Sequence, residues 1–219
     1  MRVRECGDAM LLVEFEPVID PAVNERAIVL AARLRGRNMR GVRDVVPGYC
    51  TVGVHFDPLQ TDLAALEHAI ADDGGAVDGI ESPATSTPIE IGVHYGGPDG
   101  PDLGAVAAYA GCTEDEVIER HASRVYRVYM LGFVPGFAYM GRVEPRIAVP
   151  RLRVPRERVA AGSVGIAGLQ TGVYPVASPG GWHLIGRTES VMFDPHRTPP
   201  SLLVPGDLVR FVPISGPRS

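Results

Sequence analysis

Hydrophobic positions in the first eighty residues alternate between the spacing of strands and that of helices. Residues 9–15 (AMLLVEF) form a short apolar run that is typical of a strand. Asp20 and Pro21 then predict the N-cap and first residue of a helix, which Gly36 can end. The apolar face of this helix follows helical spacing and comprises Val23, Ala27, Leu30, Ala31 and Leu34.

Two more strands and a second helix follow in this part of the chain. Residues 42–46 are typical of a strand, and residues 50–56 alternate apolar and polar positions after a Pro-Gly turn. Thr61 is expected to cap a helix with Leu66 and Ile70 on its apolar face. The order β-α-β-β-α, with room for a last strand, predicts a ferredoxin-like sandwich.

The stretch between residues 72 and 88 is small, polar and rich in proline, which is typical of a link between domains. We therefore predict a boundary between residues 82 and 83. The expected domains are residues 1–82, which are ferredoxin-like, and residues 83–219, which carry the rest of the chain.

The second domain begins with a strand pattern at residues 89–93. Two short helices are expected next, one after residues 101–102 and one begun by Thr113 with a capping box. Residues 125–131 return to a strand pattern. From Gly132 onward only short apolar runs between glycines and prolines remain, which favours a sandwich or barrel. The chain as a whole is thus predicted to be α+β.

Charge and composition exclude several classes of protein. The chain has 219 residues and a formal net charge of -5, whereas nucleic-acid binders usually carry a basic surplus. No apolar run approaches the ~20 residues that span a bilayer, and the first residues do not resemble a signal peptide. The cysteines are odd in number and widely spaced, which suits reduced thiols in the cytoplasm: Cys6, Cys50 and Cys112.

Self-sufficient catalytic motifs are missing from the sequence. There is no phosphate loop, and the six histidines form neither a zinc motif nor a Cys-x-x-Cys partner, so no metal is expected on this chain. Ser163 lies in half of a nucleophile elbow, and we interpret it as a turn residue. The glycine loop at residues 96–102 contains two aspartates that would repel a phosphate, so a turn leading to a helix N-cap is favoured.

Two neighbouring segments are candidates for binding. The segment GFVPGFAYMG, residues 132–141, spaces its aromatics by glycine and proline and forms either a plug of a barrel end or a wall for a small ligand. Residues 142–158 then carry six arginines, most of which would be solvated, while one or two could bind an anion or an acidic partner. The candidate residues of these segments are Phe133, Pro135, Gly136, Phe137 and Arg151.

A third candidate segment surrounds the only tryptophan, Trp182. Its glycines expose backbone N–H groups and allow close approach of a ligand or another chain, and an exposed tryptophan would suit an interface. His183 and Arg187 are the candidate catalytic groups, although a structural hydrogen bond is the alternative role for His183. The candidate binding residues here are Gly162, Ser163, Gly165, Gln170, Thr171, Gly172, Ser178, Pro179, Gly180, Gly181 and Trp182.

Taken together, long motifs give the chain a family resemblance. GFVPGFAYMG, PRLRVPRERVAAGSVGIAGLQTGVYPVASPGGWHLIGRT and LLVPGDLVRF resemble the family of the 5-oxoprolinase B subunit, also labelled allophanate hydrolase subunit 1 and Kip sporulation-kinase inhibitor. The resemblance extends to GDAMLLVEF and VVPGYCTVGVHFDP near the start and so covers nearly the whole chain. One departure is Val159-Ala160, where the family usually has Val-Pro.

The resemblance implies a fold, partners and an activity. It implies a ferredoxin-like domain followed by a cyclophilin-like β-barrel. It also implies that the chain acts with a C subunit of related fold and a metal-dependent A subunit, and opens 5-oxoproline to glutamate with ATP. ATP would be bound by the complex, not necessarily by this chain, which is expected to be inactive alone. The substrate would be a small amide, with neither nucleic acid nor membrane as partner.

Three alternatives stay open on the sequence. The chain could be an allophanate hydrolase or urea-amidolyase type of subunit that acts on a small amide or urea derivative. It could also be a non-catalytic inhibitor that binds a histidine kinase. A peptidyl-prolyl isomerase is suggested only by analogy with the barrel fold.

Overall fold

The protein divides into two compact units, Met1–Thr85 and Ser86–Ser219, in a computed structural model that describes residues 1–77 and 87–214. The predicted boundary between residues 82 and 83 lies outside the described residues. Each unit has its own elements and its own hydrophobic core.

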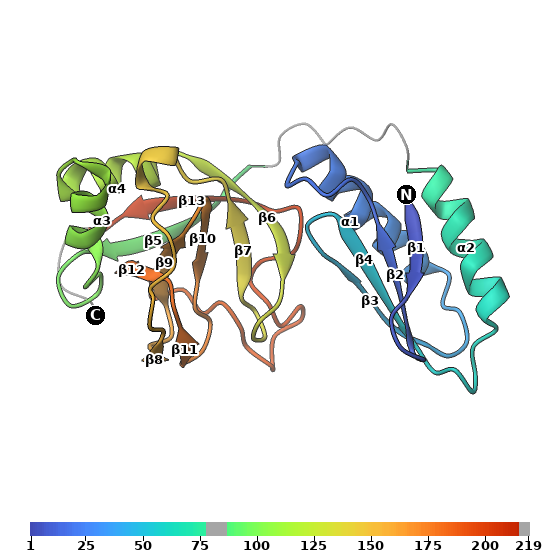
Figure 1. Cartoon of the computed structure of the whole chain (residues 1–219). Coiled ribbons are helices and arrows are strands. Elements are labelled where there is room, and N and C mark those ends of the chain that lie inside the picture. Colours follow the sequence, from blue (N-terminus) through green and yellow to red (C-terminus); the bar gives the residue numbers. More distant parts are fainter. Residues whose placement is uncertain (78–86, 215–219) are drawn as a thin grey trace. The chain divides into compact units, whose positions relative to one another are not determined.

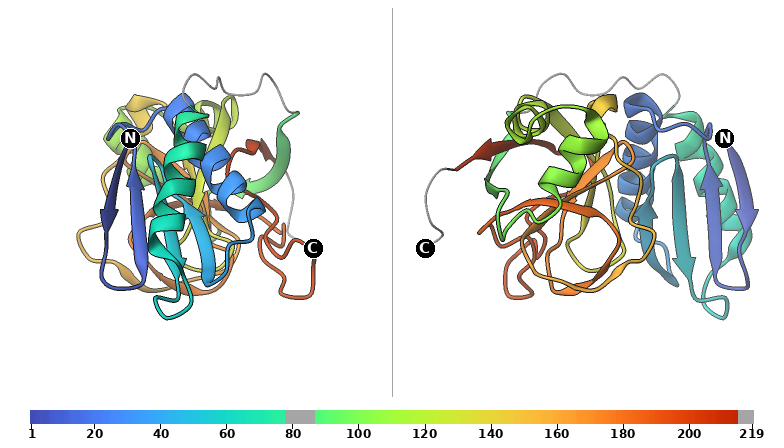
Figure 2. Two further views of the ribbon diagram at one scale, coloured as in Figure 1. Left: turned by 90° about the vertical axis from the view of Figure 1, so that its right-hand side faces the viewer. Right: turned by 60° about the vertical axis from the view of Figure 1, so that its left-hand side comes forward.

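The first unit is a sheet with two helices (Figure 1). Its strands lie in the order β1-β2-β4-β3, and every neighbouring pair is antiparallel. The two helices lie side by side over the sheet (Figure 2). The elements are β1 (Arg2–Glu5), β2 (Met10–Glu14), α1 (Pro21–Gly36), β3 (Val42–Pro47), β4 (Thr51–Phe56) and α2 (Leu63–Gly75).

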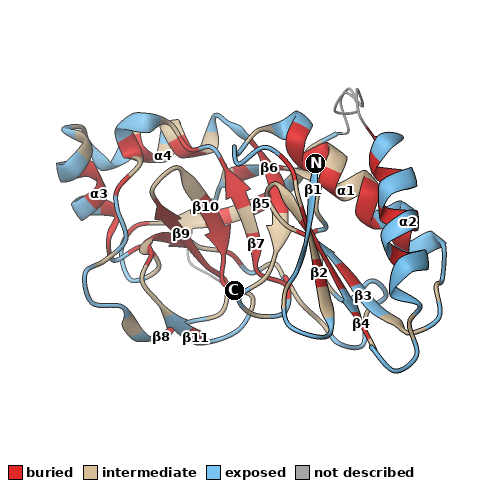
Figure 3. Cartoon of the chain, turned by 45° about the vertical axis from the view of Figure 1, so that its right-hand side comes forward, coloured by how far each residue is buried: buried red, intermediate tan, exposed pale blue. Residues whose placement is uncertain are grey.

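The first helix begins and packs as its sequence predicts. The Asp20 carboxylate accepts hydrogen bonds from the backbone N–H groups of Ala22 and Val23, and Pro21 occupies the first turn. All five predicted apolar residues are buried, and they meet alternate residues of β2 and β4 in one core. Figure 3 shows the same division on α2, whose buried residues face the sheet while exposed ones face away.

Two predictions for this unit were wrong. The N-cap of α2 is Asp62, which accepts a hydrogen bond from Ala65, so the helix begins after Asp62 and not at Thr61. The fourth strand is β1, which precedes β2 and pairs with it along one edge. Among the described residues of this unit no strand follows α2, and the observed order within the unit is β-β-α-β-β-α. The exposed, charged sequence of β1 (RVRE) has no apolar alternation that could have revealed it.

The second unit contains a closed barrel, which resolves the predicted choice between a sandwich and a barrel. The strand order around the barrel is β10-β7-β6-β13-β5-β12-β9, with β9 and β10 paired to close it. Among the described strand pairs of the barrel, only β5–β13 is parallel. The barrel strands are β5 (Ile89–Tyr95), β6 (Val125–Leu131), β7 (Ala138–Gly141), β9 (Ser163–Ala167), β10 (Gln170–Val173), β12 (His183–Arg187) and β13 (Leu208–Pro213).

Short elements surround the barrel. The two predicted helices are present, and the Thr113–Glu116 capping box of the second one is formed. They lie side by side against the barrel (Figure 1) and contribute to its core. The elements outside the barrel are α3 (Leu103–Ala110), α4 (Glu114–Ala122), the 3-10 turn η1 (Pro145–Ile147), and the paired strands β8 (Arg156–Val159) and β11 (Ser178–Gly180). Across the described residues, no helix has the length and apolar character needed to cross a membrane.

A fully buried histidine lies inside the barrel. His121 Nδ1 is 2.7 Å from the Tyr95 hydroxyl, and its Nε2 is 2.9 Å from Thr171 Oγ1. The Thr171 hydroxyl donates to the Gly165 carbonyl at 3.0 Å, so it accepts from Nε2–H, and Nδ1 accepts from Tyr95. Burial lowers the pKa of His121 to about 3 and keeps the ring neutral.

This network changes the interpretation of Thr171. The residue was predicted to bind a substrate or partner, but it is completely buried and its hydroxyl is used inside the barrel. Through its contact with His121, Thr171 connects β10 to α4.

Candidate functional site

A layer of aromatic side chains covers the outer face of the barrel wall. Successive residues of a strand point to opposite faces, so Val164 and Ile166 fill the barrel while residues on the other face of the strands contact this layer. Phe137 is at its centre, with ring centroids 5.3 Å from Trp182, 5.3 Å from Tyr174 and 4.8 Å from Tyr139, each in an edge-to-face arrangement.

Glycines on the barrel wall make room for this layer. A Cβ atom on Gly172 would lie 3.1 Å from Phe137 Cζ and 3.2 Å from Trp182 Cζ3. A Cβ atom on Gly165 would lie 3.1 Å from Trp182 Cβ. The glycine-rich sequence had predicted close approach of a ligand or partner chain, but at these two positions the protein's own rings approach the backbone.

Trp182 is buried, contrary to the prediction of an exposed aromatic face. Only 4% of its surface is accessible, and it packs with Phe137 and Tyr174. The exposed aromatic of this region is Phe133, which is 58% accessible and lies edge-to-face with Phe137 at 5.6 Å. Trp182 is therefore a wall of the site and not its outer surface.

The aromatic layer borders a cavity of about 240 Å³, which is the candidate functional site. Its walls contain seven of the predicted residues: Phe133, Phe137, Arg151, Pro179, Gly180, Gly181 and Trp182. These come from three separate parts of the sequence, as expected for a binding site assembled by a fold. Three further lining residues were missed by the sequence analysis: Tyr139, Pro155 and Tyr174.

Strand periodicity could have identified two of the missed residues. Tyr139 lies two positions after Phe137, and Tyr174 lies two positions after Gly172, so each shares a face with a residue that was predicted. Pro155 offers no such signal, because its position depends on the course of the loop before β8.

Phe133 has an uncommon backbone conformation, with φ of 69° in the left-handed region. It lies between the 240 Å³ cavity and a second, shallower cavity of about 470 Å³ that Pro135, Gly136 and Phe193 also line. A Cβ atom on Gly136 would lie 2.6 Å from Phe193 Cβ. The predicted Pro135 and Gly136 therefore shape the turn that carries Phe133 and do not line the candidate site.

Arg151 is the cationic residue of the cavity. Among the described residues no carboxylate pairs with it, and the other lining side chains are neutral. The neighbouring Arg156 is engaged instead with Asp102, at 2.6 Å, and with the Trp182 carbonyl at 3.4 Å. Most arginines of the basic segment were expected to be solvated, but Arg156 has structural contacts, while Arg151 lines the cavity.

The two tyrosines beside Arg151 remain protonated at neutral pH. Burial raises the pKa of Tyr139, and the charge of Arg151 opposes that effect. Burial also raises the pKa of Tyr174, while a hydrogen bond from the Trp182 backbone and the charge of Arg151 oppose it. The cavity therefore combines neutral phenols with one positive charge.

The two predicted catalytic residues lie outside the cavity walls. Arg187 donates from Nε to the Ala161 carbonyl at 2.8 Å and supports the turn before β9. His183 is part of β12, and its buried Nδ1 has no hydrogen-bond partner in the described structure. Neither residue has the arrangement of a catalytic group around this cavity.

The remaining predicted residues are buried, closely packed or paired within strands, and do not line the candidate cavity. Ser163 is buried at the start of β9, and a Cβ atom on the preceding Gly162 would lie 2.3 Å from the Thr188 carbonyl oxygen. Gln170 pairs across β10 with residues of β7 and β9. Ser178 is buried on β11, and its Oγ has no partner among the described residues.

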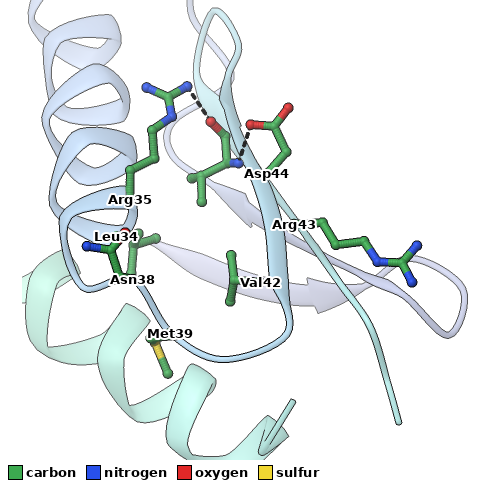
Figure 4. A pocket seen from close by; sticks show the side chains of 8 residues that line it. Leu34, Arg35, Asn38, Met39, Val42, Arg43 and Asp44 are labelled. Carbon is green, nitrogen blue, oxygen red and sulfur yellow. Dashed lines mark hydrogen bonds between the residues drawn. The ribbon is translucent and has the colours of Figure 1, made fainter. Parts of the chain in front are cut away.

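The first unit also has a cavity, of about 290 Å³, but its polar groups are already engaged. Figure 4 shows Arg35 reaching the Val45 carbonyl and Asp44 accepting a hydrogen bond from the Val45 N–H group. Arg43 points away from the cavity in the same view and pairs with Asp57. The 240 Å³ cavity of the second unit is the better candidate, because no carboxylate in the described part of the chain pairs with its arginine.

In the described part of the chain, no cluster of three or more histidine, cysteine, aspartate or glutamate side chains could hold a metal ion. The histidines do not cluster, and both ring nitrogens of His121 are engaged in hydrogen bonds with Tyr95 and Thr171. The chemistry of the candidate site is therefore that of aromatic rings, phenols, backbone groups and one guanidinium.

Comparison with known proteins identifies the family. The family described as carboxyltransferase domain, subdomain C and D, matches residues 1–203. A relative from Escherichia coli O157:H7, named as the B subunit of 5-oxoprolinase, is 44% identical over 210 residues, which is 94% of this chain and 93% of the relative. A Bacillus subtilis protein of the same name is 37% identical over 228 residues, covering 98% of this chain and 93% of the relative.

Solved structures agree with this relationship. The crystal structure of TTHA0988 superimposes with a TM-score of 0.84 at 37% identity, and the match covers 96% of this chain but 40% of that longer chain. The Kluyveromyces lactis urea amidolyase has a TM-score of 0.77 at 21% identity, with 97% of this chain and 15% of that chain covered, and this similarity shows a shared fold alone. The chain belongs to the carboxyltransferase-domain family of subdomains C and D, among the proteins named as 5-oxoprolinase B subunits.

Proposed function

We propose that this protein is the B subunit of an ATP-dependent 5-oxoprolinase, which converts 5-oxo-L-proline to L-glutamate. The observation that carries the proposal is the 44% identity to the Escherichia coli B subunit over 94% of the chain. In the overall reaction, water is added across the amide C–N bond of the lactam. A second water molecule converts ATP to ADP and phosphate.

The chain acts in this proposal as one part of a complex. A related C subunit would form the pair that phosphorylates the lactam, and a metal-dependent A subunit would complete hydrolysis. The lack of a phosphate loop in the sequence supports a division of labour in which this chain does not bind ATP alone. The isolated chain is expected to be inactive.

The fold and compartment belong to the same proposal. We infer that the first unit is a variant of the ferredoxin-like sandwich in which β1 supplies the edge strand, and that the barrel is cyclophilin-like. The support is the pair of helices over an antiparallel sheet and the closed barrel, respectively. A reducing cytoplasm is the expected location, since the three cysteines are unpaired.

Reconstitution tests the proposal directly. The chain would be co-expressed with its cognate C subunit, the pair purified, the A subunit supplied, and glutamate release from 5-oxoproline measured with and without ATP. ATP-dependent glutamate release supports the proposal. A stable pair that releases no glutamate contradicts it and points to another amide or urea derivative, and the absence of any pair favours the alternative of a non-catalytic inhibitor.

A further inference from the structure

The cavity beside Trp182 has the size of a single small ring. Its volume is about 240 Å³, below the 300–1,000 Å³ typical of sites for drug-sized ligands. Two buried rings, Phe137 and Trp182, and the half-exposed Phe133 supply flat apolar walls. A compact ring with little conformational freedom would bury most of its surface there at a small entropic cost.

The charge of the cavity restricts the ligand further. Arg151 is its only charged lining residue, and no aspartate or glutamate lies among the described residues that line it. A guanidinium binds a carboxylate through two parallel hydrogen bonds. A ligand with one carboxylate would therefore neutralise the cavity, whereas a polyphosphate would leave several negative charges against aromatic rings.

Polar groups close to Arg151 can orient the rest of such a ligand. Tyr139 and Tyr174 line the cavity with phenols that are neutral at pH 7, and burial raises their pKa values further. The nearest contact of a Cβ atom on Gly181 would be Pro155, at 3.7 Å, so there is space beside Gly181 in the cavity wall, although its carbonyl already accepts from the Leu152 N–H at 2.8 Å. A ring bound in the cavity would therefore have phenols beside its edge.

We propose that this cavity binds a small cyclic monocarboxylate, with its carboxylate on the Arg151 guanidinium and its ring between Phe133, Phe137 and Trp182. The choice of a lactam carboxylate as the ligand rests on the proposed function, since 5-oxoproline has this chemistry. Binding itself needs neither ATP nor a partner chain. The role of Arg151 is thus substrate recognition and not proton transfer.

Titration of the full chain tests this proposal, because its only tryptophan lines the cavity and reports occupancy. Tryptophan fluorescence would be followed during addition of 5-oxo-L-proline, its carboxamide and 2-pyrrolidinone, and calorimetry would repeat each titration independently of the fluorophore. We expect saturable binding of the acid. The two neutral lactams should bind at least about tenfold more weakly, because they lack the charge-assisted hydrogen bonds between a carboxylate and Arg151.

Variants test how much the Arg151 guanidinium itself contributes to binding. Arg151→Gln should weaken binding of the acid at least about tenfold and remove the preference over the carboxamide, while Arg151→Lys should restore part of it. Arg153→Gln is the matched control, since Arg153 is exposed nearby and does not line the cavity. Equal affinity of the wild type and Arg151→Gln, or no saturable signal by either method, would overturn the proposal.

Kinetics of the reconstituted complex distinguish this proposal from the proposed function. If the complex converts 5-oxoproline, Arg151→Gln should raise the KM for 5-oxoproline and leave the KM for ATP unchanged. An active complex in which Arg151→Gln changes neither KM means that the cavity is not the substrate site, although the proposed function stands. A chain that binds 5-oxoproline through Arg151 in a complex that releases no glutamate supports the site and contradicts the function.

Discussion

Gly172 is a residue whose missing side chain has a visible reason. A Cβ atom there would lie 2.9 Å from the Ala138 carbonyl oxygen as well as against the rings of Phe137 and Trp182. Gly172 pairs with Gly165 of β9, and Ala138 pairs with Leu131 of β6, so strand pairing holds the backbone on both sides of this contact. Gly172 therefore allows the aromatic layer to lie flat on the barrel wall.

The first prediction follows from this contact. Gly172→Ala should lower the free energy of unfolding by about 1–3 kcal/mol, the usual effect of forcing extra volume into a filled core. Urea unfolding followed by tryptophan fluorescence would measure it. Gly181→Ala is the matched control, because its Cβ atom would make only an ordinary contact of 3.7 Å with Pro155. Equal stability of the two variants would show that the aromatic side chains shift to accommodate the added methyl group at little cost, and would contradict the prediction.

A second residue-scale prediction concerns His121. Its pKa is about 3 in the folded protein because burial disfavours the charged ring, against an ordinary value of 6.5. As the pH falls below 6.5, His121 takes up a proton in the unfolded chain but not in the folded protein. The free energy of unfolding is therefore highest above pH 6.5 and decreases as the pH falls toward 3. The limiting slope is about 1.4 kcal/mol per pH unit.

Urea unfolding at pH 7.5 and pH 5 would check this slope. His121→Gln keeps a donor for Thr171 but does not titrate, so it should lose stability at pH 7.5 and show a smaller further loss at pH 5 than the wild type. His196→Gln serves as the control, since His196 is exposed in the same unit. A wild type as stable at pH 5 as at pH 7.5 would contradict the neutral buried histidine.

At the scale of elements, Asp102 connects three parts of the second unit. It stands at the N-terminus of α3, where the sequence predicts a cap, but its side chain makes no capping hydrogen bond. One carboxylate oxygen instead contacts Arg156 at 2.6 Å, and the other accepts from the buried Leu184 N–H at 2.7 Å. The carboxylate thereby holds the start of β8 and β12 together next to the candidate site.

Removing this carboxylate should destabilise the second unit. Asp102→Ala leaves the Leu184 N–H unsatisfied and Arg156 unpaired, so we expect a loss of about 1–3 kcal/mol in the free energy of unfolding. Arg156→Ala should cost less, because the hydrogen bond to Leu184 remains. Glu157→Ala, at an exposed position beside Arg156, is the control in the same unfolding assay. A loss for Asp102→Ala no greater than for Glu157→Ala would contradict this role.

Elements with strong local signals could be predicted from the sequence, and those set by distant contacts could not. The Asp20-Pro21 start of α1 and the Thr113 capping box are encoded within a few residues, and both are confirmed. The edge strand β1 exists because β2 offers it a partner. In the site, Trp182 and Arg151 were identified as residues, but the burial of one and the exposure of the other depend on how three segments meet.

At the scale of the whole molecule, the closed barrel depends on its last strand. β13 lies between β6 and β5, pairing antiparallel with one and parallel with the other. Two of its side chains, Val209 and Phe211, are buried in the barrel core. Without β13 both neighbouring strands would have an unpaired edge, and the barrel core would be open to water.

A truncated chain tests this dependence. A chain ending at residue 207 should lose the native tryptophan emission and aggregate, as seen by fluorescence and size-exclusion chromatography. A chain ending at residue 214 keeps β13 and should retain both properties. Native emission from the shorter chain would show that the barrel unit folds without β13, and would contradict this prediction.

The pairing of β13 with β5 also has a consequence for biosynthesis. The ribosome makes β5 first and β13 last among the elements of the unit, although Ile89 of β5 pairs with Val209 of β13 in the folded barrel. At about 5–20 residues per second, several seconds pass in which the apolar edge of β5 has emerged and its partner does not yet exist. The nascent chain is exposed to mispairing during this interval, so its yield in a cell should depend on chaperones that shield β-strand edges until translation reaches β13.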